Sequence, residues 1–225
     1  MKNPTCSTTA YILLAIYIVL TNTWAYAQTT HAEKISAFLA EHEDAVPLIV
    51  IQDGRGDFSN WENFKAEIID RDHIHVPKTN PRTVQEFGDF KLIFEFKMDP
   101  GANSGIFLRG LGEMQMLENT HKKYAKLKES QYHGSAYGLV AAKRGHLKPV
   151  GEWNYQEVVV IGQTITVHLN GTQILDADLS KPIKNKKGNT VKPKTNTTGP
   201  LRLGGHASGV YYRNMYAVEL PASSN

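Results

Sequence analysis

The stretch Phe90-Lys-Leu-Ile-Phe-Glu-Phe-Lys-Met98 carries the clearest structural signal in this chain of 225 residues. Large apolar residues recur at every second position, while Lys91, Glu95 and Lys97 point the other way. Successive side chains of a β-strand face opposite sides of a sheet, so this period of two predicts a half-buried strand. The turn dipeptide Pro100-Gly101 follows it.

Further strands are predicted on both sides of this segment. A meander covers residues 155–161, 164–169 and 172–177, and its second turn is Asn170-Gly171. Asn-Gly between alternating segments is the strongest short hairpin signal, because a type I′ turn needs positive φ at both central residues. Other strands are predicted at 48–51, 104–109, 113–118, 201–203 and 210–220. Hairpin-linked strands without βαβ alternation predict an all-β fold, an antiparallel β-sandwich.

The first 27 residues have the order of a secretory signal peptide. Lys2 precedes an apolar stretch from Ala10 to Leu20, and Ala25-Tyr26-Ala27 supplies a small-x-small cleavage site. The apolar stretch is about 11 residues long, short of the ~20 that span a bilayer. An uncleaved membrane anchor is the alternative. We therefore expect a secreted or periplasmic bacterial protein with no stable membrane insertion after the signal is removed.

The composition excludes several classes of protein. With 41% hydrophobic residues, 21% charged residues and a net charge of +3, the chain is not disordered, and its charge gives no indication of nucleic-acid binding. The single cysteine, Cys6, lies within the signal, so the mature chain has no disulfide and no Cys-based zinc site. Helical periodicity of Ile35, Phe38 and Leu39 predicts a short helix. The predicted organisation is signal peptide 1–27, N-terminal helical extension 28–45 and β-sandwich domain 46–221.

A lysine-rich stretch interrupts the strands near the end of the chain. Residues 181–194 carry six lysines together with Pro, Asn and Gly. Runs of charge are usually solvated, so a flexible insertion is the favoured interpretation, and a site for an anionic partner is the alternative.

A series of motifs then points to one family. The motifs are Phe87-Gly-Asp-Phe90, Asn103-Ser-Gly-Ile-Phe-Leu-Arg-Gly110, Glu113-Met-Gln-Met-Leu-Glu-Asn119, Tyr137-Gly138, Lys148-Pro-Val-Gly-Glu-Trp-Asn154, Val167-His-Leu-Asn-Gly171 and Tyr212-Arg-Asn214. In that order they resemble the secreted 3-keto-disaccharide hydrolase family over residues 46–220. The resemblance implies a concanavalin-A-like, laminin-G-like jelly roll that acts on oxidised sugars. This chain departs from the family pattern at Gly112, where Tyr is usual, and at Gly204-Gly205-His206, where Gln-Asp-His is usual.

Glu113 is the first candidate for a catalytic residue. It shares a strand face with Gln115, and a glutamate can act as base, acid or metal ligand, although a solvated carboxylate is the alternative. The neighbouring Arg109 presents a guanidinium fork that can bind sugar oxygens, or it can form a structural ion pair.

The implied 3-keto chemistry needs a base, an acid and stabilisation of an enolate. A ketone at C3 acidifies the C2 proton, so its removal allows the C1 oxygen to leave by β-elimination, and water can then add back. His206 suits the base or acid because imidazole titrates near neutral pH. The predicted catalytic set is therefore Glu113, His206 and Arg109. Glu113 could also hold a divalent cation such as Ca²⁺ or Mg²⁺ that polarises the ketone.

The expected partner is a carbohydrate, and four residues are candidates for binding it. Asn103, Gln115 and Tyr137 can hydrogen-bond sugar hydroxyls, and Trp153 can stack on a sugar ring. The competing interpretations are a turn residue for Asn103 and a core residue for Trp153.

Two other functions stay open at this stage. Glu113-x-Gln-x-x-Glu118 resembles the Glu-x-Asp-x-x-Glu pattern of family 16 glycoside hydrolases. That chemistry requires a bulge to bring both glutamates to one face, with carboxyls ~5 Å apart. The second alternative is a non-catalytic, lectin-like carbohydrate-binding module.

Overall fold

The computed structural model describes residues 30–77, 79–204 and 209–221, so the predicted signal peptide lies outside the described residues. Helix α2 (His31–Glu41) belongs to a unit separate from residues 42–225, and each is described by itself. The helix begins with a capping box, because the Thr30 hydroxyl accepts from the Glu33 amide at 3.2 Å while the Glu33 carboxylate accepts from the Thr30 amide at 2.7 Å. It ends before the predicted residue 45. None of the helices in the described ranges is long and apolar enough to cross a membrane.

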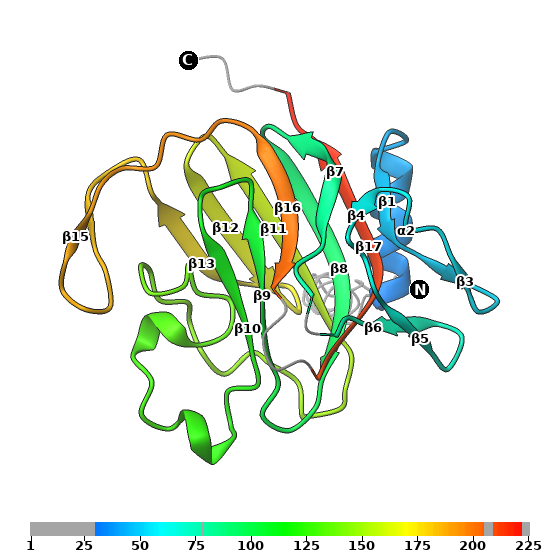
Figure 1. Cartoon of the computed structure of the whole chain (residues 1–225), viewed down its shortest axis with the longest axis horizontal. Helices are drawn as coiled ribbons and strands as arrows, with labels where there is room; N and C mark the ends of the chain where they lie inside the picture. Colours follow the sequence, from blue (N-terminus) through cyan, green and yellow to red (C-terminus); the bar gives the residue numbers. More distant parts are fainter. Residues whose placement is uncertain (1–29, 78, 205–208, 222–225) are drawn as a thin grey trace, which may run out of the picture. The chain divides into compact units, whose positions relative to one another are not determined.

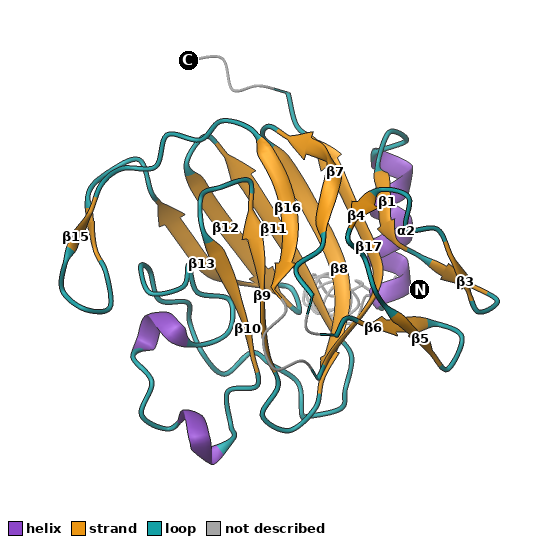
Figure 2. Cartoon of the chain, in the orientation of Figure 1, coloured by secondary structure: helices purple, strands orange, loops and turns teal. Residues whose placement is uncertain are grey.

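Residues 42–225 form two packed antiparallel sheets, which Figures 1 and 2 show as two layers of arrows. The larger sheet has the order β13-β12-β11-β8-β17-β6-β5, and β1 also pairs with β17. Its strands are β1 (Val46–Ile49), β5 (Glu67–Ile69), β6 (His73–His75), β8 (Phe90–Met98), β11 (Asn154–Ile161), β12 (Thr164–Leu169), β13 (Thr172–Asp178) and β17 (Val210–Glu219).

The smaller sheet has five strands in the order β10-β9-β16-β7-β4. They are β4 (Trp61–Glu62), β7 (Arg82–Phe87), β9 (Asn103–Leu108), β10 (Glu113–Leu117) and β16 (Gly199–Gly204). Two separate two-stranded hairpins lie outside both sheets: β2 (Ile51–Gln52) with β3 (Arg55–Gly56), and β14 (Ile183–Lys184) with β15 (Thr190–Val191). The described residues also contain two 3-10 turns, η1 (Lys122–Tyr124) and η2 (Glu129–Gln131). Within the insertion predicted at 181–194, β14 and β15 pair as a short hairpin that the sequence analysis did not predict.

The core lies between the sheets, and β8 runs through the middle of it. The five apolar residues of the alternating stretch, Phe90, Leu92, Phe94, Phe96 and Met98, are at most 5% exposed. Each such side chain stabilises the fold by roughly 1.5–3 kcal/mol through removal of apolar surface from water. Antiparallel β11 and β17 flank β8 on its two edges. Ile93 and Glu95 on the opposite face are also at most 2% exposed, so β8 is buried on both faces and is not the half-buried strand that was predicted. The fold is the all-β jelly-roll sandwich that the sequence predicts.

Sequence patterns located the long strands well and the short ones poorly. β8 and β12 have the predicted bounds, and the Asn170-Gly171 turn has φ of +50° and +88°, as a type I′ turn requires. Strands β4, β5 and β6 contain two or three residues, too few to show a period. In β7 only Thr83 and Phe87 are buried, so that strand also shows no alternation.

The buried His133 makes stability depend on pH. Its Nε2 lies 2.9 Å from Gln156 Oε1, its Nδ1 accepts from the Leu117 amide at 3.4 Å, and its ring stacks on Phe96. Burial lowers the pKa of His133 to about 4, although the Gln156 bond opposes the shift. His133 is therefore protonated below about pH 6.5 in the unfolded chain, but only below about pH 4 in the folded chain.

We expect protonation of His133 in the unfolded chain to lower the free energy of unfolding by about 3 kcal/mol as the pH drops from 6.5 to 4. Above pH 6.5 His133 should make no pH-dependent contribution. Urea unfolding at a series of pH values measures the slope. His133→Gln should remove this part of the slope, whereas His168→Gln should retain it. An unchanged slope in His133→Gln would contradict the assignment.

Candidate active site

The alternation of β10 determines which side chains face away from the core. Met114 and Met116 are at most 1% exposed and enter the core together with Ile106 of β9. Neighbouring residues of a strand point to opposite faces, so Glu113 and Gln115 lie on the outer face of the smaller sheet. The sequence prediction that these two share a face agrees with this arrangement.

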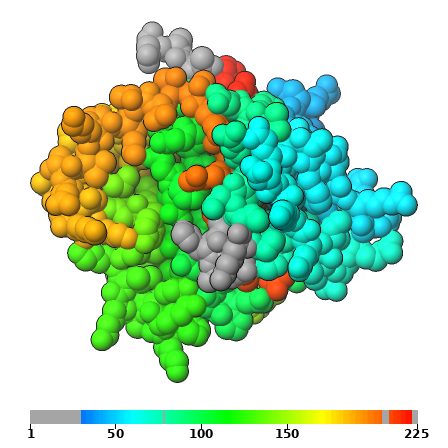
Figure 3. Space-filling view, viewed as in Figure 1, coloured from blue at the N-terminus to red at the C-terminus, as the bar shows by residue number. Residues whose placement is uncertain are grey.

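Two glycines form the floor of this outer face. Gly105 of β9 lies opposite Gln115 on one side and opposite Gly204 of β16 on the other. A Cβ atom added to Gly105 would overlap the Glu113 carboxylate, so that carboxylate lies directly over bare backbone. A Cβ on Gly204 would lie 3.2 Å from the Gly105 carbonyl oxygen. Figure 3 shows this face hollowed over the orange atoms of β16.

A short segment extends the outer face beyond β10. The Tyr137 amide donates to the Glu113 carbonyl at 2.8 Å, and Ala136 forms an antiparallel bridge with Met114. Because Met114 and Ala136 both enter the core, Tyr137 lies opposite Glu113 and on the same outer face. Side chains of directly opposite residues have Cβ atoms about 4.5–5.5 Å apart. Glu113 and Tyr137 are therefore neighbours in the hollow.

The Tyr137 hydroxyl receives two hydrogen bonds. Lys186 Nζ lies 2.6 Å from it, and Gln131 Nε2 donates at 3.1 Å. Lys186 comes from the turn between β14 and β15, and its amide donates to the Gly138 carbonyl at 2.7 Å. The hairpin thus forms one side of the site and brings a positive charge to it.

Two amide side chains present buried acceptors to this region. Gln115 is 4% exposed, and its Nε2 donates to the Gln131 carbonyl at 3.3 Å. Its Oε1 and the Asn103 Oδ1 are buried and have no hydrogen-bond partner among the described residues. An unsatisfied buried acceptor costs about 1–3 kcal/mol, which a donor such as a sugar hydroxyl would recover.

Arg109 lies elsewhere, in the turn that joins β9 to β10. Its side chain is fully buried and pairs with Asp89 at 3.2 Å, while it also donates to the carbonyls of Asn196 and Gly162. Burial lowers the pKa of Arg109, and Asp89 partly offsets that effect. The guanidinium therefore ties three loops together, and its predicted catalytic role receives no support from this placement.

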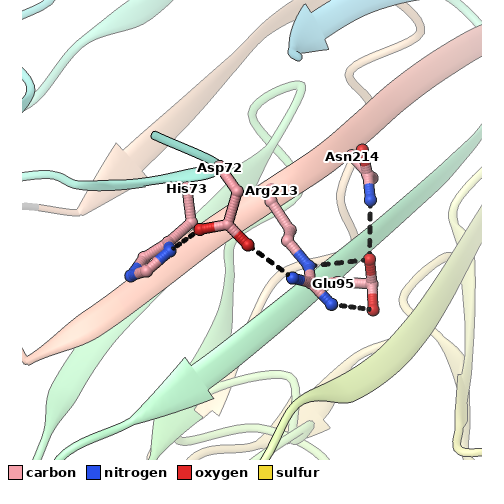
Figure 4. Close-up of polar contacts among 5 residues, drawn as sticks. All are labelled: Asp72, His73, Glu95, Arg213 and Asn214. Carbon is pink, nitrogen blue, oxygen red and sulfur yellow. Dashed lines mark hydrogen bonds and ion pairs between the residues drawn. The ribbon is translucent and has the colours of Figure 1, made fainter. Parts of the chain in front are cut away.

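Trp153 also lies apart from Glu113, on the outer face of the larger sheet. The guanidinium of Arg213 lies 4.0 Å from the centre of the Trp153 ring, and the His73 ring meets it edge-on at 5.2 Å. Figure 4 shows the polar network around Arg213, which pairs with Glu95 and with Asp72. Asp72 also contacts His73, and Asn214 donates to Glu95. The network neutralises the buried Glu95. Sugar stacking on Trp153 stays a prediction.

Glu118 is not paired with Glu113. Its carboxylate accepts from the Thr120 amide at 2.6 Å and from the Gly101 amide at 3.0 Å. Burial raises its pKa, but these and neighbouring hydrogen bonds outweigh burial and lower it overall. The β9–β10 ladder runs from Glu113↔Phe107 to Leu117↔Asn103 in continuous register. The bulge that family 16 chemistry requires is therefore not found in this ladder.

The other predictions concern a metal and His206. Within the described part of the chain, no group of three or more His, Cys, Asp or Glu side chains is arranged to hold a metal ion. Cation binding by Glu113 thus stays a prediction. His206 follows Gly204 by two positions and lies outside the described residues, so its role also stays a prediction.

Three polar residues on this side of the sandwich were missed by sequence reasoning. Lys186 and Gln131 contact Tyr137, and Arg202 stacks over the Phe107 ring at 3.9 Å. Arg202 could have been found, because in Leu201-Arg202-Leu203 the two leucines enter the core and leave the arginine on the outer face. Lys186 gave no signal within its lysine-rich stretch.

The topology and the polar outer face define an antiparallel β-sandwich with a candidate active site on its smaller sheet. Residues 47–217 match the family of 3-keto-alpha-glucoside-1,2-lyase-like domains, and the chain belongs to that family.

Individual proteins resemble the chain more distantly. A 3-keto-disaccharide hydrolase of Bacteroides thetaiotaomicron is 28% identical over 116 residues, 42% of this chain and 40% of that protein. The match thus spans about two fifths of that relative's length. A crystal structure of a glycosyl-hydrolase-like protein from Parabacteroides distasonis is 26% identical with a TM-score of 0.67, covering 79% of this chain and 100% of that chain. A second one, at 24% identity and a TM-score of 0.63, covers 79% and 84% and shows the shared fold.

Gly105→Ala should displace the Glu113 carboxylate while leaving the sandwich folded, because the flexible carboxylate can move and the strand backbone stays extended. We expect a loss of turnover with little change in the thermal unfolding midpoint. Gly88→Ala is the matched control, because its added Cβ would meet only Glu219 Oε1, at 3.9 Å. Full activity in Gly105→Ala would contradict the claim that the bare backbone of Gly105 positions the Glu113 carboxylate.

Arg109→Met should destabilise the protein by about 3–5 kcal/mol, because it leaves the partly buried Asp89 without its ion pair. Urea unfolding measures this loss. Lys181→Met removes an exposed ion pair with Asp178 and should change stability little. If Arg109→Met instead retained stability and lost turnover, Arg109 would be catalytic as the sequence alone suggested.

Proposed function

We propose that this chain cleaves the glycosidic bond of 3-keto-glycosides by β-elimination across C1 and C2, followed by addition of water. Membership of the family over residues 47–217 supports this substrate class. The observation that carries the proposal is the Glu113 carboxylate lying over the bare backbone of Gly105 on the outer face of the smaller sheet. Because Gly105 has no side chain of its own, the Glu113 carboxylate can lie close to the strand and leave space above it for a sugar ring.

In this proposal Glu113 is the base that removes the C2 proton. The C3 ketone delocalises the electron pair left on C2, which lowers the barrier to removal of the C2 proton by a general base. The developing enolate oxygen requires positive charge or hydrogen-bond donors. Arg202, held on the outer face by its stacking on Phe107, supplies such a charge two strands from β10. His206 is proposed to assist as acid or base.

The two orphaned acceptors orient the substrate. Gln115 Oε1 and Asn103 Oδ1 can each accept from a sugar hydroxyl, which would satisfy atoms that have no partner in the described ranges. Sites built on buried acceptors discriminate strongly against a ligand without the matching hydroxyl. The proposed location of this reaction is the periplasm or the medium, because residues 1–27 read as a signal peptide.

Neither alternative function has the same support. A conventional retaining glycosidase needs a second carboxyl ~5 Å from Glu113, and Glu118 is instead held by backbone amides. A lectin-like module needs only the hollow and its acceptors, so a measurement of turnover has to separate it from an enzyme.

The test compares a 3-keto-disaccharide with the same disaccharide unoxidised, using wild type, Glu113→Gln and Glu86→Gln. We expect wild type to cleave only the oxidised sugar. Glu113→Gln should lose about 10²–10⁴-fold in turnover, the contribution of one general base. Glu86 is exposed on β7 of the same sheet, so Glu86→Gln should match wild type.

Three outcomes would contradict the proposal. Cleavage of the unoxidised sugar alone would indicate a conventional glycosidase. Saturable binding of the oxidised sugar without turnover would indicate a binding module. Equal turnover by wild type and Glu113→Gln would show that Glu113 is not the base.

A further inference from the structure

The hydrogen bonds at Tyr137 determine where its own proton can go. The ammonium of Lys186 can only donate, and it lies 2.6 Å from the Tyr137 hydroxyl oxygen. Gln131 Nε2 donates to the same oxygen at 3.1 Å. The orientation of the Gln131 amide is supported at its other end, where Oε1 accepts from the Lys128 amide at 3.3 Å.

With two donors directed at it, the phenolic oxygen has both acceptor positions used. Its O–H bond must then point away from Lys186 and Gln131, and no residue within the described ranges accepts that proton. Tyr137 is half-buried rather than enclosed and lies opposite Glu113 on the outer face. The free O–H is therefore a donor in the same hollow as the carboxylate.

We infer that Tyr137 is the acid that protonates the leaving oxygen of the glycoside, and that Lys186 and Gln131 are positioning residues that aim its proton. This inference rests on the proposed function, and it adds a catalytic role to a residue that sequence reasoning assigned only to substrate binding. The lysine-rich hairpin thereby acquires a part in the reaction.

The elimination step balances with these two residues. Glu113 takes the proton from C2, and the C2–H electron pair becomes the C1=C2 double bond. The C1–O bond breaks, its electron pair stays on the leaving oxygen, and the Tyr137 proton converts that oxygen into the released alcohol. The products are a conjugated enone, a protonated Glu113 and a Tyr137 phenolate.

The addition of water reverses both transfers. The phenolate takes a proton from water while the water oxygen bonds to C1, and Glu113 returns its proton to C2. Between the two steps, the Lys186 ammonium stabilises the phenolate through a charge-assisted hydrogen bond, and it also lies 3.9 Å from the ring centre. The net reaction is hydrolysis, and the enzyme returns to its starting state.

A pair of substrates with different leaving groups tests this role. 4-Nitrophenyl 3-keto-α-glucoside releases a stable phenolate that needs no proton, whereas methyl 3-keto-α-glucoside releases methoxide unless an acid protonates it. Tyr137→Phe should lower turnover of the methyl substrate by about 10²–10⁴-fold and change that of the nitrophenyl substrate little. Its thermal unfolding midpoint should stay close to that of wild type.

Lys186 is tested with the same substrates. Lys186→Met should lower turnover of the methyl substrate by roughly 10- to 100-fold, the equivalent of one hydrogen bond to a charged group, and spare the nitrophenyl substrate. Lys186→Arg should restore most of the activity. The matched control is Lys187→Met, because the adjacent Lys187 side chain is exposed and should not affect either substrate.

Equal losses of turnover on both substrates in Tyr137→Phe would overturn the inference that Tyr137 is the acid, and would leave it as a binding residue. Unchanged turnover of the methyl substrate would exclude any part in the reaction. If wild type cleaved neither substrate, the proposed function would fail and the inference with it, a result that differs from failure of Tyr137 alone.

Discussion

The alternation of side chains along β9 and β10 is the constraint on which both the core and the site depend. Met114 and Met116 can reach the core only if Glu113 and Gln115 point outward. A slip of one residue in register would bury the carboxylate and expose the methionines, at a large cost in free energy. The hydrophobic effect that closes the sandwich therefore also fixes the direction of the catalytic candidates. Stability and site geometry are set by the same few residues.

The site is assembled from segments that are distant in the sequence. Glu113 comes from β10, Gly204 from β16, Tyr137 from a connecting segment and Lys186 from the β14–β15 hairpin. Only the sandwich brings them to one face. Each supplies a different property, namely a carboxylate, a bare floor, a phenol and a positive charge, and none of these would be informative alone.

Sequence reasoning succeeded where a residue's direction follows from a local period. It placed the strands around Phe90–Met98, and it grouped Glu113 with Gln115 because they lie two positions apart. It offered a structural ion pair as the alternative for Arg109, but it could not identify Asp89 as the partner, because the pairing depends on a turn with a backbone φ of +39° at Arg109. It could not place Trp153 or Lys186, because their positions depend on contacts with Arg213 and Tyr137 that no local pattern encodes.

The hairpin that carries Lys186 is closed at its base, because the Lys194 amide donates to the Leu179 carbonyl at 2.9 Å and Ile183 pairs with Val191. Residues inserted or deleted between those pairs change the height of one wall of the hollow without sliding β13 or β16. The size of ligand that fits against that wall can thus diverge during evolution while the sandwich keeps its register. Changes in this hairpin can therefore alter the specificity for ligand size without affecting the folding of the sandwich.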